Sequence, residues 1–346
     1  MIVPCFKVFT RLFLPVLLVS LLFALPGNAQ DAQFSQYFAN PLYLNPALAG
    51  SEECHRLNLG FRNQWTSMPG PYTTFSASYD AYIKKAKSGI GLIYINDFAG
   101  VNTLKTTSLN LVYSYHLQLN KSWQMNSGIS GGFVRQAYDL SQLTFGDQIQ
   151  NEGNIQPTAE NLKNAVFVDP DLSFGVVVHN KSVWVSGAAK HINREQHDIL
   201  GGRTITEYSF ASIAAGFTIP IRNVNLYHRD DDVPSMSPSV MFRKQSNFIQ
   251  LDMGLSFDFL PITIGAYYRG IPIVSNGYRT VNQDAAIFLI GFTADAFKMG
   301  YSYDVPVSQV GPVYGGSHEI TAAYLFNSPR LAKKRKDYQS LPCPRF

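Results

Sequence analysis

Histidine and carboxylate side chains, which bind metal ions and transfer protons, gather at two places in this sequence. One group comprises His191, Glu195, His197 and Asp198, and the other comprises His228, Asp230, Asp231 and Asp232. Neither group has a recognised metal-ligand spacing, and both fall in segments that we expect to be loops. We therefore interpret both groups as solvated loop polarity, and we expect no metal and no cofactor.

Motifs of catalysis are missing from the sequence. It contains no Gly-x-Ser-x-Gly elbow, no His-Glu-x-x-His zinc motif and no Cys-x-x-Cys pair. Gly128, Gly131 and Gly132 lack the following Lys and Ser/Thr of a phosphate-binding loop, so we interpret them as strand glycines that permit bends or close packing. We expect no enzymatic activity; an enzyme with its site at the rim of a membrane barrel is the weaker alternative.

Strict alternation of apolar and polar residues is the main structural signal. From Ile249 to Phe259 every odd position is apolar, and every even position is Gln, Asp, Gly or Ser. Successive side chains of a strand point to opposite faces, so one face of such a strand is apolar and the other polar. Fourteen strand-like segments can be marked: residues 56–66, 72–83, 89–98, 104–119, 122–138, 169–179, 183–192, 204–219, 238–244, 248–259, 262–269, 285–294, 297–305 and 317–326.

Composition and connection lengths favour a membrane barrel. Charged residues make up 15% of the chain and aromatic residues 13%, while mean hydropathy is near zero. After residue 29, no stretch approaches the roughly 18 apolar residues of a membrane helix. Tight turns alternate with long connections, except for a long connection at 222–237. We expect an all-β protein: a transmembrane antiparallel barrel of about 14 strands over residues 56–326, with tight turns in the periplasm.

The polar faces of these segments carry charges of both signs. The charged residues expected in the lumen are Arg62, Asp80, Lys190, Asp252, Asp258, Arg269, Lys298, Asp304 and Glu319. A lumen of mixed sign indicates a crosslinked interior more than the single-sign filter of an ion pore. A porin-like solute channel nevertheless stays open as the alternative function.

The two ends of the chain differ from the strand pattern. Residues 1–29, with Lys7 and Arg11 before an apolar run and Ala29 at the cleavage position, are typical of a signal peptide. Residues 30–55 form an N-terminal periplasmic or plug segment, and residues 327–346 form a basic periplasmic tail. We expect both termini in the periplasm and, because the protein is exported, no nucleic-acid partner. Cys54 and Cys343 either form a disulfide or stay free.

Residues 31–50 contain two Asn-Pro pairs and four aromatic residues. Asn-Pro favours turns and extended backbone, and so many aromatic side chains must pack against something. We weigh a plug inside the barrel, which we favour, against a docking strand for a periplasmic partner. The candidate partner-binding residues are Phe34, Tyr37, Asn40, Pro41, Asn45 and Pro46 in this segment, and Lys333, Lys334, Arg335 and Lys336 in the tail.

Several motifs closely resemble the PorP/SprF family. They are QFSQYFANPLYLNPA at 33–47 with Gly50, RNQW at 62–65, GYSYD at 300–304, GGSHEI at 315–320 and the ending CPRF at 343–346. The match therefore spans essentially the whole chain after the leader, although the middle is not diagnostic. The long connection at 222–237 departs from the short periplasmic turn that we would expect in this position.

The resemblance implies an outer-membrane barrel of Bacteroidetes-type bacteria that serves type IX protein secretion and often gliding motility. It implies that the protein works with periplasmic secretion-system lipoproteins and a peptidoglycan-binding protein, or helps to export and hold secreted surface adhesins. We expect a non-enzymatic component that is surrounded by outer-membrane lipid and docks such partners.

Overall fold

The computed structural model describes residues 31–100, 104–139, 165–193, 196–198, 204–206, 209–221, 233–246, 248–275, 281–307 and 314–326. Three short helices, η1 (Tyr37–Ala39), α2 (Pro41–Leu44) and η2 (Pro46–Leu48), precede the strands, and η3 (Lys84–Ala86) follows the second strand. None of the helices in these residues is long and apolar enough to cross a membrane.

The strands follow one another along the chain. They are β1 (His55–Gln64), β2 (Tyr72–Ile83), β3 (Ser88–Ala99), β4 (Leu104–Gln118), β5 (Gln124–Tyr138), β6 (Ala165–His179), β7 (Val183–Lys190), β8 (Gln196–Asp198), β9 (Thr204–Thr206), β10 (Phe210–Phe217), β11 (Ile219–Pro220), β12 (Ser235–Gln245), β13 (Phe248–Phe259), β14 (Ile262–Ser275), β15 (Val281–Ala294), β16 (Phe297–Pro306) and β17 (Ser317–Phe326). They confirm the expected all-β class.

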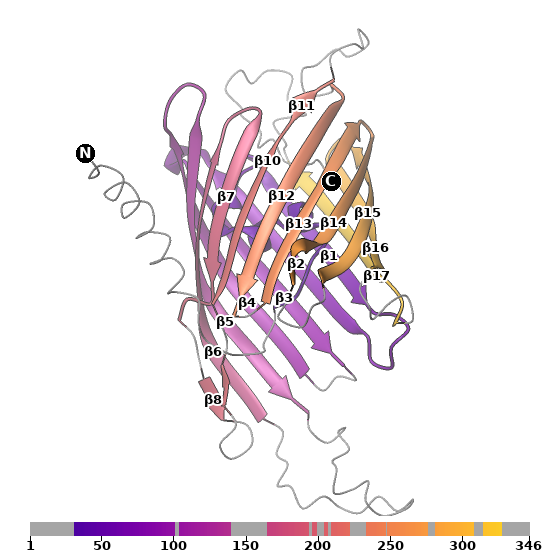
Figure 1. The fold of residues 1–346 in the computed structure, drawn as a ribbon. Coiled ribbons are helices and arrows are strands. Elements are labelled where there is room, and N and C mark those ends of the chain that lie inside the picture. The colour runs from indigo at the N-terminus through magenta and orange to yellow at the C-terminus, as the bar shows by residue number, and fades with distance from the viewer. Residues whose placement is uncertain are drawn as a thin grey trace, which may run out of the picture.

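Fourteen of the described strands form one closed antiparallel barrel (Figure 1). Each strand pairs with its neighbour in the chain order, and β1 closes the ring by pairing with β17, from His55 opposite Phe326 to Gln64 opposite Ser317. β10 pairs directly with β12, so β11 is a short addition at one end, and β8 and β9 form a separate hairpin. The segment expected to be one strand at 204–219 is therefore β9 followed by β10.

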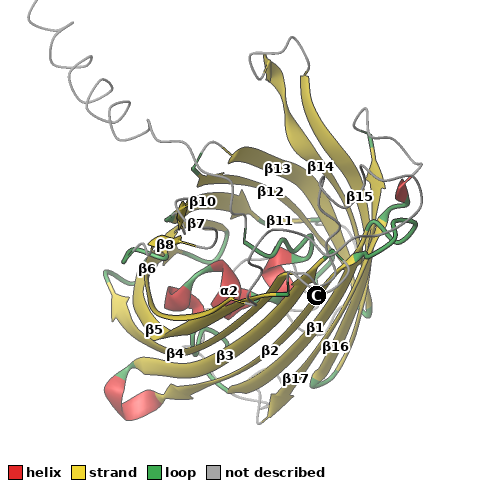
Figure 2. Cartoon of the chain, turned by 90° about the horizontal axis from the view of Figure 1, so that it is seen from below, coloured by secondary structure: helices red, strands yellow, loops and turns green. Residues whose placement is uncertain are grey.

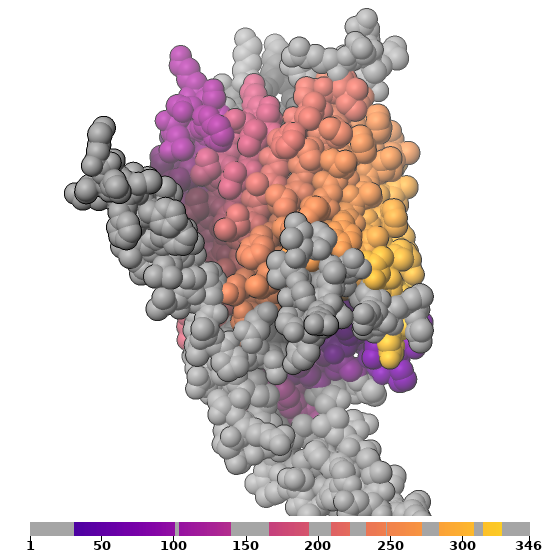
Figure 3. Space-filling view, in the orientation of Figure 1, coloured from indigo at the N-terminus to yellow at the C-terminus, as the bar shows by residue number. Residues whose placement is uncertain are grey.

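Alternation places apolar side chains outside and polar side chains inside, as the sequence predicts. Along β13, Met253, Leu255 and Phe259 are exposed, whereas Asp252 and Ser256 are buried. In the space-filling view the outer wall runs without a break across β7, β10 and β12 (Figure 3). The expected lumen charges, Arg62, Asp80, Lys190, Asp252, Asp258, Arg269, Lys298, Asp304 and Glu319, are all buried.

The two ends of the barrel differ in their connections. One end carries the tight turns at 84–87, 119–123, 180–182, 260–261 and 295–296, and we call it the inner end. The opposite end, which we call the outer end, carries most of the long connections. In bacterial barrels the tight turns face the periplasm. The five tight turns expected from the sequence therefore all lie at one end, and their periplasmic placement stays a prediction. β10 ends and β12 begins at the inner end, and residues 222–232 between them lie outside the described residues.

Candidate functional site

Residues 31–50, which we call the plug, lie inside the barrel. Seen along the barrel, α2 sits within the ring of strands (Figure 2). Phe34, Gln36, Asn45 and Ala47 have no exposed surface at all. A polar lumen can hold this segment because its strands supply hydrogen-bond partners along the whole length of the plug.

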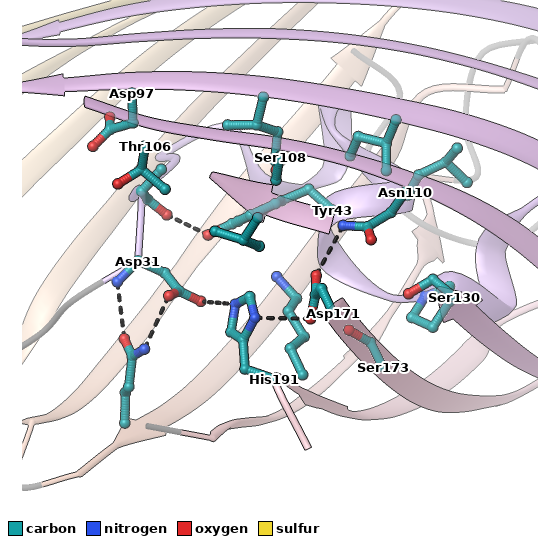
Figure 4. Close-up of a pocket in the computed structure, with 18 of the residues that line it drawn as sticks. Asp31, Tyr43, Asp97, Thr106, Ser108, Asn110, Ser130, Asp171, Ser173 and His191 are labelled. Carbon is teal, nitrogen blue, oxygen red and sulfur yellow. Dashed lines mark hydrogen bonds and ion pairs between the residues drawn. The ribbon is translucent and has the colours of Figure 1, made fainter. Parts of the chain in front are cut away.

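The plug begins at the outer end of the lumen. The backbone N–H of Asp31 donates to Gln245 Oε1 (2.9 Å) at the outer end of β12, and its carboxylate pairs with His191 Nε2 (3.0 Å). His191 Nδ1 lies 2.9 Å from Asp171 Oδ1, and Asn110 Nδ2 donates to the other oxygen of Asp171 (2.9 Å). Figure 4 shows this chain of side chains, which we call the outer clasp.

Electrostatics strengthen the outer clasp. Burial alone would raise the pKa of Asp31, but the positive charge and hydrogen bond of His191 lower it to about 2. Burial likewise opposes protonation of His191, yet the adjacent carboxylates of Asp31 and Asp171 raise its pKa well above the ordinary value. His191 thus bridges the plug and β6, and the two carboxylates favour its protonated form.

Ser35 forms the centre of a second, buried anchor. Its hydroxyl donates to Asp304 Oδ2 (2.6 Å) and accepts from Arg62 (2.7 Å) and Arg269 (2.9 Å). Its backbone N–H donates to Glu319 Oε2 (2.7 Å). Arg62 pairs with both Asp304 (2.8 Å) and Glu319 (3.1 Å). Charges of opposite sign therefore compensate one another around a plug hydroxyl, as a crosslinked lumen requires.

The two Asn-Pro pairs of the plug carry its turns. Pro41 and Pro46 begin α2 and η2, and the side chain of Asn45 caps η2 by accepting from the N–H of Ala47 (2.8 Å). Proline suits the first position of a helix because its missing N–H is unneeded there. The Asn45 amide also donates to Ser186 Oγ (2.9 Å) on β7, so the cap is itself attached to the wall.

The plug ends at the inner end of the lumen. The N–H of Gly50 donates to Asp80 Oδ2 (2.7 Å), whose carboxylate also pairs with Arg56 (2.9 Å). The carbonyl of Ala49 accepts from Ser114 Oγ (2.7 Å). The plug therefore runs through the barrel, and its first described residue lies at the outer end. The N-terminal residues before Asp31 lie outside the described residues, so the periplasmic N-terminus stays a prediction.

Glycines on the inner face of the wall make room for the plug. A Cβ at Gly128 would lie 2.3 Å from the backbone nitrogen of Ala47, and one at Gly89 would lie 2.0 Å from the carbonyl of Ala49. Real Cβ atoms do not approach so closely, so at these positions the wall accepts only glycine. The interpretation of Gly128 as a close-packing glycine is therefore correct, and its packing partner is the plug.

Apolar side chains of the plug pack against apolar positions of the lumen. Tyr37, Leu44 and Leu48 lie against Trp184 of β7 and Met241 of β12, all of them buried. Sequence reasoning missed these inward apolar residues because it assigned the lumen face to polar groups. The sequence does mark Trp184 and Met241, because each is an apolar residue at a position where the alternation of its strand requires a polar one. Packing against a plug in the lumen explains both exceptions.

Cavities remain beside the plug. One has a volume of about 100 Å³ and lies between Tyr43 of the plug and hydroxyl-bearing residues of β4 to β6, such as Ser108 and Ser130 (Figure 4). Another, of about 300 Å³, lies at the outer end and is lined by Trp65, Tyr72 and several glutamines. Lys190 stacks over the Tyr43 ring, with its nitrogen 3.3 Å from the ring centre, so this corner is held by a cation–π contact.

The structure separates the candidate partner-binding residues. Those of the plug, Phe34, Tyr37, Asn40, Pro41, Asn45 and Pro46, are all buried in the lumen. The basic residues Lys333, Lys334, Arg335 and Lys336 lie outside the described residues. Ser35 and Gln36, which donate to Asp304 and Ser302, were not among the candidates because these contacts join segments far apart in the sequence. His191 was considered only as a metal ligand in a solvated loop.

The structure also gives the positions of some of the histidine, carboxylate and cysteine candidates. His191 belongs to the outer clasp, whereas Glu195 and His228 lie outside the described residues. No group of three or more potential metal ligands occurs in the part of the chain that is described. Cys54 is buried and makes no disulfide within that part, and burial raises the pKa of its thiol to about 12. Cys343 lies outside it.

Residues 27–324 match the family model described as type IX secretion system membrane protein PorP/SprF. The chain belongs to the PorP/SprF family. This confirms the family resemblance drawn from the motifs at the two ends of the chain. The PorP/SprF chain described here is thus an outer-membrane β-barrel and a component of type IX protein secretion.

Other comparisons are more distant. No curated protein matches the sequence. Among solved structures, the P. putida toluene transporter TodX is 9% identical over 82% of this chain and 92% of its own, with a TM-score of 0.45. A Pseudomonas aeruginosa FadL homologue is 10% identical over 83% and 94%, with a TM-score of 0.43. A Rh. blastica porin mutant is 8% identical over 79% and 99%, with a TM-score of 0.33.

Proposed function

We propose that this PorP/SprF barrel is a sealed, non-enzymatic platform in the outer membrane. Its inner end docks periplasmic components of the secretion machinery, and its outer end supports the export or surface anchoring of secreted proteins. The observation that carries the proposal is the plug, which fills the lumen and uses the lumen charges for its own attachment through Ser35 and Asp31.

The proposed partners are periplasmic secretion-system lipoproteins, a peptidoglycan-binding protein and a secreted surface adhesin, which in some family members serves gliding motility. The basic tail from Arg330 to Phe346 has charges suited to an acidic partner. Residues of the plug such as Phe34 and Tyr37 could bind a partner only after the plug leaves the lumen, because both are buried within it. We therefore assign the first docking contacts to the tail and the inner rim.

Two measurements test this proposal on the full-length protein. In planar bilayers the sealed platform should give no steady conductance, whereas a large steady conductance would support the alternative of a porin-like solute channel. Co-purification from native membranes, followed by identification of the bound chains, should recover secretion components. Deletion of residues 330–346 should leave the barrel folded and weaken that recovery; unchanged recovery would remove the tail from the proposal.

A further inference from the structure

Three neighbouring turns at the inner end each contain a lysine followed by a serine. The pairs are Lys87-Ser88, where the turn after β2 meets the first residue of β3, Lys121-Ser122 between β4 and β5, and Lys181-Ser182 between β6 and β7. Because β2 to β7 are consecutive in the barrel, the three turns follow one another along one arc of the rim. The β4–β5 and β6–β7 turns stand next to each other at the upper left of Figure 1.

Hydrogen bonds fix two of these lysines at the tips of their turns. Asn120 Oδ1 accepts from the N–H groups of Ser122 and Trp123, both at 2.9 Å. Asn180 Oδ1 accepts in the same way from Ser182 (2.8 Å) and Val183 (2.7 Å). In such an Asx turn the asparagine side chain replaces a backbone partner, and the residue after it occupies the tip. Lys121 and Lys181 occupy these positions and are exposed.

The third turn presents its lysines by another geometry. η3 carries Lys84 and Lys85, and its C-cap Lys87 has a left-handed backbone with φ of 49°. The carbonyl of Lys87 accepts from the N–H of His116 (2.9 Å), which fastens the turn to β4. Lys84, Lys85 and Lys87 are all exposed. We call Lys84, Lys85, Lys87, Lys121 and Lys181 the basic arc.

The described tight turns of the inner rim differ in charge. The three turns of the basic arc contain no Asp or Glu, whereas the tight turns at 260–261 and 295–296 across the rim contain no Lys or Arg and include Asp295. Neighbouring turns of the arc are two strands apart, or about 10 Å. This spacing slightly exceeds the Debye length of about 8 Å at physiological salt, so the potentials of neighbouring turns overlap only in part and high salt weakens them further.

We propose that the basic arc is a docking surface for the acidic face of a periplasmic protein, a proposal that rests on the function proposed above. Lipid surrounds a barrel on all sides, so lysines that serve lipid headgroups would be needed all around the rim. In the described turns they are confined to one arc. A protein partner that covers one side of the inner end fits this distribution, and charge complementarity would steer and orient it.

Matched double variants test the arc in the full-length protein. We compare Lys121→Glu/Lys181→Glu with Lys105→Glu/Lys244→Glu, which changes two lysines near the outer end. Heat-modifiable migration on gels checks that each barrel folds; Lys121→Gln/Lys181→Gln replaces the first variant if it does not. We expect the inner-end variant to lose about tenfold of the co-purified periplasmic protein, the outer-end variant to keep it, and high salt to weaken the wild-type complex.

The possible outcomes are distinct. Equal recovery of the periplasmic protein with wild type and with the inner-end variant would show that the basic arc is not the docking surface. It would leave the proposed function intact. Failure of the wild type itself to recover any secretion component would overturn the proposed function. A third arm compares binding to phosphatidylcholine vesicles with and without phosphatidylglycerol. If the inner-end variant loses only preference for phosphatidylglycerol, the arc is a lipid site and the docking proposal is wrong.

Discussion

Substituting alanine for Gly128 should unseat the plug, whereas the same change at Gly131 on the same strand should not. The new Cβ at position 128 would lie 2.3 Å from the nitrogen of Ala47 and 2.4 Å from the carbonyl carbon of Pro46, both backbone atoms of the plug. Ordinary contact begins at 3.4 Å, so the plug must move by about 1 Å. Overpacking of this kind costs about 1–3 kcal/mol, a shift of roughly 5- to 150-fold towards the unseated plug.

Gly131 supplies the control because it faces away from the plug. The nearest atom to a Cβ at Gly131 is Leu172 Cδ2 at 3.5 Å, which is ordinary contact. Gly131→Ala should therefore leave stability unchanged or raise it by a few tenths of a kcal/mol, since glycine weakens a strand.

Limited proteolysis and planar-bilayer recordings measure the outcome for both variants. We expect Gly128→Ala to expose the plug to protease and to show intermittent conductance, with wild type and Gly131→Ala protected and silent. If the two variants behave alike in both assays, the space left by glycine in the wall does not decide whether the plug fits, and the reasoning is refuted.

Three further perturbations address the anchors of the plug and one turn of the basic arc. Arg62→Met removes the buried partner of two carboxylates and should lower the free energy of unfolding by about 3–5 kcal/mol in urea titrations; a loss below 1 kcal/mol would contradict this. Because the pKa of Asp31 is lowered, its carboxylate stabilises the seated plug above about pH 4, and this stabilisation is lost as pH falls towards 2. Because the pKa of His191 is raised, its imidazole stabilises the seated plug below about pH 6.5, and this stabilisation is lost as pH rises through the raised pKa. Protease protection of the plug should thus be greatest between these limits, and His191→Gln should abolish the alkaline loss. Asn180→Ala removes two turn hydrogen bonds and should cost about 1 kcal/mol, read as a lower melting temperature without loss of the folded barrel.

Much of the barrel could be predicted because its signal is local. Alternation with a period of two assigns each side chain to lipid or lumen without knowledge of its neighbours. This is why all nine expected lumen charges, including Arg62 and Glu319, are buried as predicted. Strand ends were less certain: β6 begins at Ala165, before the expected 169, because its pairing with β5 continues to Tyr138.

The plug could be anticipated only in outline. Its Asn-Pro pairs and aromatic residues indicate a packed, irregular segment, but not its path through the lumen. The partners of Ser35 lie on β1, β14, β16 and β17, at sequence separations that no local pattern encodes. For the same reason His191 was expected in a solvated loop and is found bridging two carboxylates.

The sequence by itself determined the family motifs, the barrel and the face on which each charge lies, because these depend on residue type and a two-residue period. The tertiary structure decided what fills the lumen, which charges pair and which lysines share one arc of the rim. Those features arise only when ring closure through β1 and β17 brings distant segments together. The physical reason is that buried hydrogen bonds and ion pairs depend on distances in space, whereas lipid contact depends on orientation along a single strand.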